Sequence, residues 1–246
     1  MDALLYFIIA FALSTLFAMA GAGSGIALIP VLHMMGVDFN LAKAVGLFTG
    51  FTTTVTSSVM NFRRKVLDVR FALPLAVTML LFAPLGAQLS RFVDVTLVKG
   101  LFVLFLLFSA TMMMFFKKEA KARYDRPWVL AALGAAVGLV SGLLGVGGGN
   151  LLLPLLVLLG FAPKKVAVAV SFVVPFSAFT SFLSYASFVA IDWVLLASCA
   201  AGAVAGGYTG NYLMHFKLSQ AQIKKVIALI LYILAIRMGW QLLQGA

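Results

Sequence analysis

The sequence predicts an all-α, polytopic membrane protein built from two repeats. Of the 246 residues, 63% are hydrophobic and only 10% are charged, which leaves too little polar surface for a soluble globule. The apolar runs recur along the whole chain, and they reach the roughly 20 residues that a bilayer-spanning helix needs. The short alternating strands of an outer-membrane barrel do not appear in the sequence.

The charge pattern points to a membrane and not to nucleic acid. The net charge is +11, but the basic residues form short clusters between apolar runs, as the positive-inside rule expects for cytoplasmic loops. The first apolar run has no basic region before it, so we expect it to be retained and not cleaved as a signal peptide. Cys199 is the only cysteine, which excludes an intramolecular disulfide and favours a packed thiol.

An offset of 124 residues superimposes the second half of the chain on the first without a gap. For example, Asp68 aligns with Asp192 and Gly86 with Gly210. A duplication explains this repetition and predicts a first transmembrane repeat at 1–118, a basic cytoplasmic linker at 119–127 and a second repeat at 128–246. The apolar segments lie at 3–36, 41–62, 69–90, 96–116, 128–160, 164–188, 192–214 and 219–243.

The first segment of each repeat is too long for one crossing. About 34 helical residues would span roughly 50 Å, whereas the hydrocarbon core is about 30 Å thick. Glycine is unfavourable inside helices and accepts the backbone angles of a turn, so we expect breaks at Gly21–Gly25 and Gly145–Gly149. The residues after each break, Ile26–Met35 and Asn150–Leu159, should form half-helices of about 15 Å.

Two topologies follow from these breaks. If the broken segment crosses the membrane, the repeats are parallel and ten basic residues lie inside and eight outside. If it is a re-entrant hairpin, each repeat has the hairpin plus three transmembrane helices, the repeats are inverted, and the count becomes fourteen inside and four outside. The stronger bias favours inverted repeats.

The two glycine breaks are the first candidates for a binding site. A helix start carries unsatisfied N–H groups and a partial positive charge, which suits an anion. Close helix packing is the alternative role for such glycines. The expected substrate-binding residues at the breaks are Gly23, Ser24, Gly25, Gly147, Gly148, Gly149 and Asn150.

Hydroxyl groups follow one face of the second segment in each repeat, where Thr53 aligns with Ser177 and Ser57 with Ser181. They either line a substrate path or bond to neighbouring backbone as structural contacts. Two further residues are accessory candidates. Lys43 would either attract an anion at the outer mouth or reach the interface as an ordinary lysine, and His33 would either carry a proton or pack as a hydrogen-bonded ring.

The glycine-rich break, Pro30 and Gly36, then Gly46 and a basic loop, followed by Gly147-Gly148-Gly149-Asn150 before Pro154, resembles the sulfite exporter TauE/SafE family of membrane permeases. The resemblance covers essentially the whole chain. It implies transport of small sulfur-containing anions such as sulfite or sulfonates across a prokaryotic plasma membrane.

The expected function is therefore that of a multi-pass plasma-membrane permease that moves a small sulfur oxyanion, with sulfite and export as the leading expectation. An anion channel, or a transporter of another organic anion such as a sulfonate, is the alternative. A membrane enzyme is disfavoured, because the carboxylates all lie at segment ends or in loops. We expect the lipid bilayer and the anion as partners, with no nucleic acid, metal or cofactor, and leave open whether the protein is a monomer or a homodimer.

Overall fold

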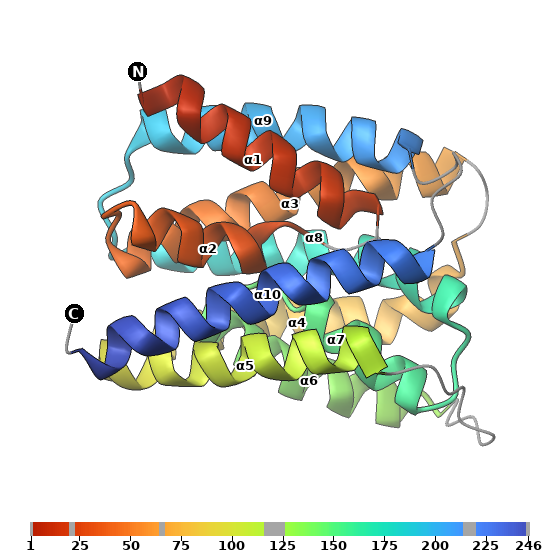
Figure 1. Cartoon of the computed structure of the whole chain (residues 1–246). Coiled ribbons are helices and arrows are strands. Elements are labelled where there is room, and N and C mark those ends of the chain that lie inside the picture. The colour runs from red at the N-terminus through yellow and green to blue at the C-terminus, as the bar shows by residue number, and fades with distance from the viewer. Residues whose placement is uncertain (1, 20–22, 64–66, 116–125, 214–219, 245–246) are drawn as a thin grey trace.

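A computed structural model describes residues 2–19, 23–63, 67–115, 126–213 and 220–244. These residues form an all-helical bundle, and no strand occurs among them (Figure 1). The helices are α1 (Asp2–Met19), α2 (Gly25–Met34), α3 (Phe39–Arg63), α4 (Val69–Leu89), α5 (Val95–Phe115), α6 (Pro127–Leu144), α7 (Gly149–Leu158), α8 (Pro163–Ala186), α9 (Trp193–Leu213) and α10 (Gln220–Leu243).

Six of these helices are long and apolar enough to cross a bilayer: α4, α5, α6, α8, α9 and α10. The helix α3 has 25 residues, but its hydroxyl side chains and Lys43 make it less apolar. The predicted fold class, an all-α multi-pass membrane protein, is confirmed.

Both over-long segments are broken where the glycines predict. In the first repeat α1 ends at Met19 and α2 begins at Gly25. In the second, α6 ends at Leu144 and α7 begins at Gly149. Each half-helix starts one residue earlier than predicted and has 10 residues, or about 15 Å. Gly21, Ala22 and most of the predicted linker 119–127 lie outside the described residues.

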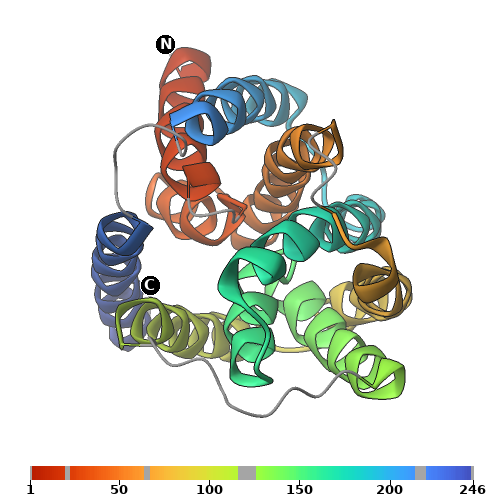
Figure 2. The ribbon, with the colours of Figure 1, turned by 90° about the vertical axis from the view of Figure 1, so that its right-hand side faces the viewer.

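The 124-residue offset relates each packed pair of helices to another packed pair. The offset relates α1 to α6 and α4 to α9, and α1 packs on α9 just as α6 packs on α4. Between the two repeats, α3 packs on its counterpart α8, and α5 packs on its counterpart α10. Figure 2 shows these pairs end-on, with α5 and α10 together on one side of the bundle. The offset in the sequence therefore reappears as an equivalence of contacts in space.

Matched glycines make the equivalent contacts close. A Cβ added to Gly86 on α4 would lie 2.0 Å from the carbonyl oxygen of Leu139 on α6. Its counterpart Gly210 on α9 would place a Cβ 2.3 Å from the carbonyl oxygen of Thr15 on α1. Because the sequence offset relates both members of the two contacts, the same backbone approach is built twice. Small residues serve the same purpose at membrane helix interfaces generally.

The matched helices α5 and α10 run in opposite directions along the bundle. In Figure 1, α5 runs from left to right, whereas α10 runs from right to left and ends near the side on which α1 begins. Opposite directions are what inverted repeats require. The orientation of each repeat in the membrane, and the repeat boundaries, stay predictions.

Candidate functional site: the glycine tip between α6 and α7

The break between α6 and α7 is a turn that only glycine forms without strain. Gly145, Gly147 and Gly148 have φ angles of 76°, 69° and 79°, in the left-handed region that other residues rarely adopt. The helix α6 ends on this turn, because the N–H of Gly145 donates to Gly142 O and that of Val146 to Ser141 O. We call residues 145–150 the second tip and residues 23–26 the first tip.

The second tip presents N–H donors at a buried helix start. Intrahelical bonding in α7 begins with the N–H groups of Leu151 and Leu152, which donate to Gly148 O at 3.2 and 2.9 Å. The N–H groups of Gly149 and Asn150 therefore have no intrahelical acceptor. Asn150 is only 3% exposed, and its Oδ1 has no hydrogen-bond partner in the described part of the chain. Buried polar groups are normally satisfied. Because an amide oxygen only accepts hydrogen bonds, the capacity of this tip for an anion lies in its free N–H groups.

The second tip is packed tightly by its surroundings. A Cβ on Gly148 would lie 2.3 Å from Met79 Cε on α4 and 3.0 Å from Ser141 Oγ on α6. A Cβ on Gly149 would lie 2.9 Å from Val174 on α8. Ser177 Oγ donates to Gly147 O at 2.9 Å, so α8 holds the turn directly. Three helices thus fix the position of the N–H groups at the start of α7.

The first tip differs, because its serine already has a partner. Ser24 precedes α2 without capping it through its side chain; its Oγ instead lies 2.7 Å from Ser14 Oγ on α1. The Ser24 hydroxyl, expected at the start of α2, therefore bonds to α1 in this structure. Ala27 and Leu28 donate to Ser24 O, so the N–H groups of Gly25 and Ile26 have no intrahelical acceptor here either.

Gly25 and Gly23 serve close packing at the first tip. A Cβ on Gly25 would lie 2.4 Å from Gly46 O, so the backbones of α2 and α3 touch there. Gly23 packs against Gly50 and Thr54 on the same helix, α3. In the second tip, Gly147 packs in the same way against Ala178 on α8. Each tip thus lies against the long central helix of its own repeat, and the second tip keeps the more unsatisfied polar groups.

Most of the predicted hydroxyl stripe bonds to backbone. Thr53 Oγ1 donates to Thr49 O at 2.8 Å and Ser57 Oγ to Thr53 O at 3.2 Å, both within α3. Ser177 holds the second tip, as described above. Ser181 is buried, and its Oγ has no partner in the described part of the chain. The structural interpretation fits Thr53 and Ser57, whereas Ser181 keeps a hydroxyl available for a substrate path.

The two accessory candidates have different surroundings. His33 is half-buried; its Nδ1 lies 3.0 Å from Val37 O, and its ring packs edge-on against Phe39. This is the packed, hydrogen-bonded ring that was one of its two expected roles. Lys43 is 1% exposed and donates from Nζ to Ser90 Oγ at 2.7 Å. Its ammonium group therefore stays inside the bundle and does not reach the interface as an ordinary lysine would.

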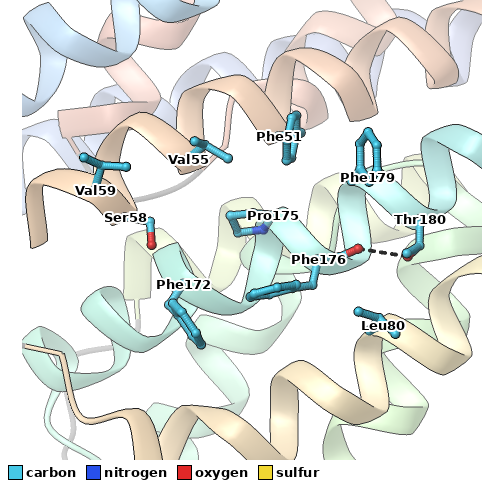
Figure 3. Close-up of a pocket in the computed structure, with 10 residues that line it drawn as sticks. All are labelled: Phe51, Val55, Ser58, Val59, Leu80, Phe172, Pro175, Phe176, Phe179 and Thr180. Atoms are coloured by element: carbon cyan, nitrogen blue, oxygen red, sulfur yellow. Dashed lines mark hydrogen bonds between the residues drawn. The ribbon is translucent and has the colours of Figure 1, made fainter. Parts of the chain in front are cut away.

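A groove of about 360 Å³ lies between α3, α8 and α4 (Figure 3). Its walls are almost entirely apolar and include Phe51, Pro175 and Phe179. Of its two hydroxyl residues, Thr180 donates to Phe176 O on its own helix. The groove therefore offers little to an anion.

Sequence reasoning missed three polar residues around the tips: Ser14, Ser90 and Tyr185. Ser14 and Ser90 bond to Ser24 and Lys43, as described above, and the Tyr185 hydroxyl donates to the last carbonyls of α6. The repeat in the sequence could have indicated only one of these three residues. Under the 124-residue offset, the three positions align with Gly138, Met214 and Asn61 respectively. Only Tyr185 therefore has a polar counterpart that could have singled it out.

The comparisons with known proteins agree with this architecture. The profile of a family described as "Sulfite exporter TauE/SafE" matches residues 6–238. A "probable membrane transporter protein" of Methanocaldococcus jannaschii is 29% identical over 193 residues, which cover 74% of this chain and 71% of that protein. A second protein of that description, from Bacillus subtilis, is 25% identical over 262 residues and covers 93% of each chain. Since the family profile spans nearly the whole chain, the protein is a multi-pass membrane transporter of the TauE/SafE sulfite exporter family.

Proposed function

We propose that the protein is a permease that exports a small sulfur oxyanion, with sulfite as the substrate, and that the second tip binds this anion. The observation that carries the proposal is the start of α7, where two N–H groups without intrahelical acceptors adjoin the buried amide side chain of Asn150. A helix start favours negative charge.

The hydrogen-bonding capacity of the tip suits an oxyanion. The N–H groups of Gly149 and Asn150 are donors, and the Asn150 side chain adds two more through its amide nitrogen. Among the described residues, no carboxylate lies in a helix interior, so no fixed negative charge opposes the ligand from within the bundle. Hydrogen bonds from such donors to an anion are stronger than those between neutral groups.

Export requires no further coupling on electrostatic grounds. An inside-negative potential drives an anion outward with about 2.3 kcal/mol per charge per 100 mV. A carrier and a channel differ in their kinetics: saturable flux that responds to anions on the opposite side supports the carrier, whereas large single-channel currents would support the channel.

The test is sulfite flux into proteoliposomes that contain the full-length protein. We expect saturable flux in the wild type and its loss in Asn150→Asp, because a carboxylate at the tip repels an anion. Asn211→Asp is the matched control, since Asn211 is also 3% exposed with an unpartnered Oδ1 but lies on α9. Equal flux in both folded variants, or none in the wild type, would refute the proposal.

A further inference from the structure

Lys43 forms a second polar centre in the bundle, near the start of α3. It is 1% exposed, and in the described part of the chain it forms no ion pair. The carboxylate of Asp38 acts on it only at longer range. A buried charge without a close counter-ion is unfavourable unless other groups stabilise it.

Three side chains hold the Lys43 ammonium group. Nζ donates to Ser90 Oγ at 2.7 Å and lies 5.0 Å from the ring centre of Phe39 and 4.9 Å from that of Tyr185. Aromatic faces attract cations without using hydrogen-bond donors. An ammonium group has three donors, so two remain after the bond to Ser90.

This centre adjoins the second tip. A Cβ on Gly145 would lie 2.6 Å from Lys43 Cβ and 2.7 Å from its Cγ, so the lysine stem packs on the first glycine of the turn. Tyr185 joins the same region from α8 through its bonds to the last carbonyls of α6. The ammonium group of Lys99 also lies near the Phe39 ring, at 6.0 Å from its centre, but in the described part of the chain no hydrogen bond joins it to Ser90, Tyr185 or Gly145.

We propose that the Lys43 ammonium group is a second anion-binding site, next to the tip, where an oxyanion replaces Ser90 as the partner of Nζ. The inference takes sulfite as its probe and so rests on the proposed function. The Lys43 site differs from the tip site in its chemistry. A side-chain charge binds the anion at Lys43, whereas backbone N–H groups bind it at the second tip.

The experiment measures two constants. The first is the Michaelis constant for sulfite flux in proteoliposomes, and the second is the sulfite concentration that gives half of the maximal thermal stabilisation of the purified protein. Lys43→Gln keeps a hydrogen bond to Ser90 without the charge, and Lys43→Met keeps the packing on Gly145. We expect both constants to rise about tenfold to hundredfold, the range for a lost hydrogen bond to a charged group. Lys99→Gln is the control, because it removes an equal charge from a lysine that also lies near the Phe39 ring. Both constants of this variant should stay within about twofold of those of the wild type.

Unchanged constants in a folded Lys43 variant would overturn this inference while leaving the tip site intact, and absent wild-type flux would instead refute the proposed function. If neither Lys43 variant folds, sulfite binding by the Ser90→Ala variant tests the inference instead. Removing the competing hydroxyl should make sulfite bind several-fold more tightly, whereas unchanged binding would contradict the exchange.

Discussion

The turn of the second tip provides a matched pair of glycine substitutions. Gly148 and Gly36 both have left-handed backbone, with φ angles of 79° and 90°. An alanine at either position costs about 1–2 kcal/mol of backbone strain. A Cβ at Gly36 meets nothing within 4 Å, whereas one at Gly148 meets Met79 Cε at 2.3 Å and Ser141 Oγ at 3.0 Å. The Met79 contact is the end of a flexible side chain that can move aside, so repacking adds about 1 kcal/mol, the low end of the usual cost of overpacking.

Gly148→Ala should therefore unfold at a lower temperature than Gly36→Ala, and only Gly148→Ala should displace the N–H groups that follow it. Loss of one such bond to an anion is expected to raise the Michaelis constant for sulfite about tenfold or more. The assays are thermal unfolding in detergent and flux in proteoliposomes. The reasoning is refuted if folded Gly148→Ala keeps the wild-type constant, or if Gly36→Ala raises it equally.

Two further predictions concern the scaffold. Gly86→Ala and Gly210→Ala should each lower the free energy of unfolding by about 1–3 kcal/mol, because each added Cβ meets a backbone carbonyl; Gly100→Ala, which meets only Leu242 at 3.8 Å, should have little effect on the melting curve. The hydrogen bond from Lys165 to Asp68 lowers the pKa of that carboxyl group, so the pair stabilises the fold above the ordinary carboxyl pKa and loses this effect as the pH falls through the lowered pKa. Since both side chains are partly exposed, the contribution should be below about 1 kcal/mol, and Asp68→Asn should remove that part of the pH dependence of unfolding.

The helix breaks can be predicted from sequence because their cause is local. Glycine accepts left-handed backbone and disfavours helix, so the predicted start of α7 lies within one residue of the observed start at Gly149. The repeat is equally accessible, since the offset that aligns Gly86 with Gly210 also aligns their contacts.

The surroundings of Lys43 and of the hydroxyl groups cannot be predicted in this way. Lys43 is buried because Ser90, 47 residues away, and Tyr185 on α8 close over it, and no local pattern specifies such contacts. The sequence places the Ser24 hydroxyl at its own helix start, but Ser14 on α1 takes it as a partner. Tertiary packing decides which of several available partners a hydroxyl group uses.

The central claim is that the second tip binds the transported anion. Selenite is a heavier analogue of sulfite, and its selenium can be located by anomalous scattering in crystals of the full-length protein. The account predicts a selenium peak with its oxygens within hydrogen-bond distance of the N–H groups of Gly149 and Asn150. A bound selenite located elsewhere, with this helix start left unoccupied, would contradict it.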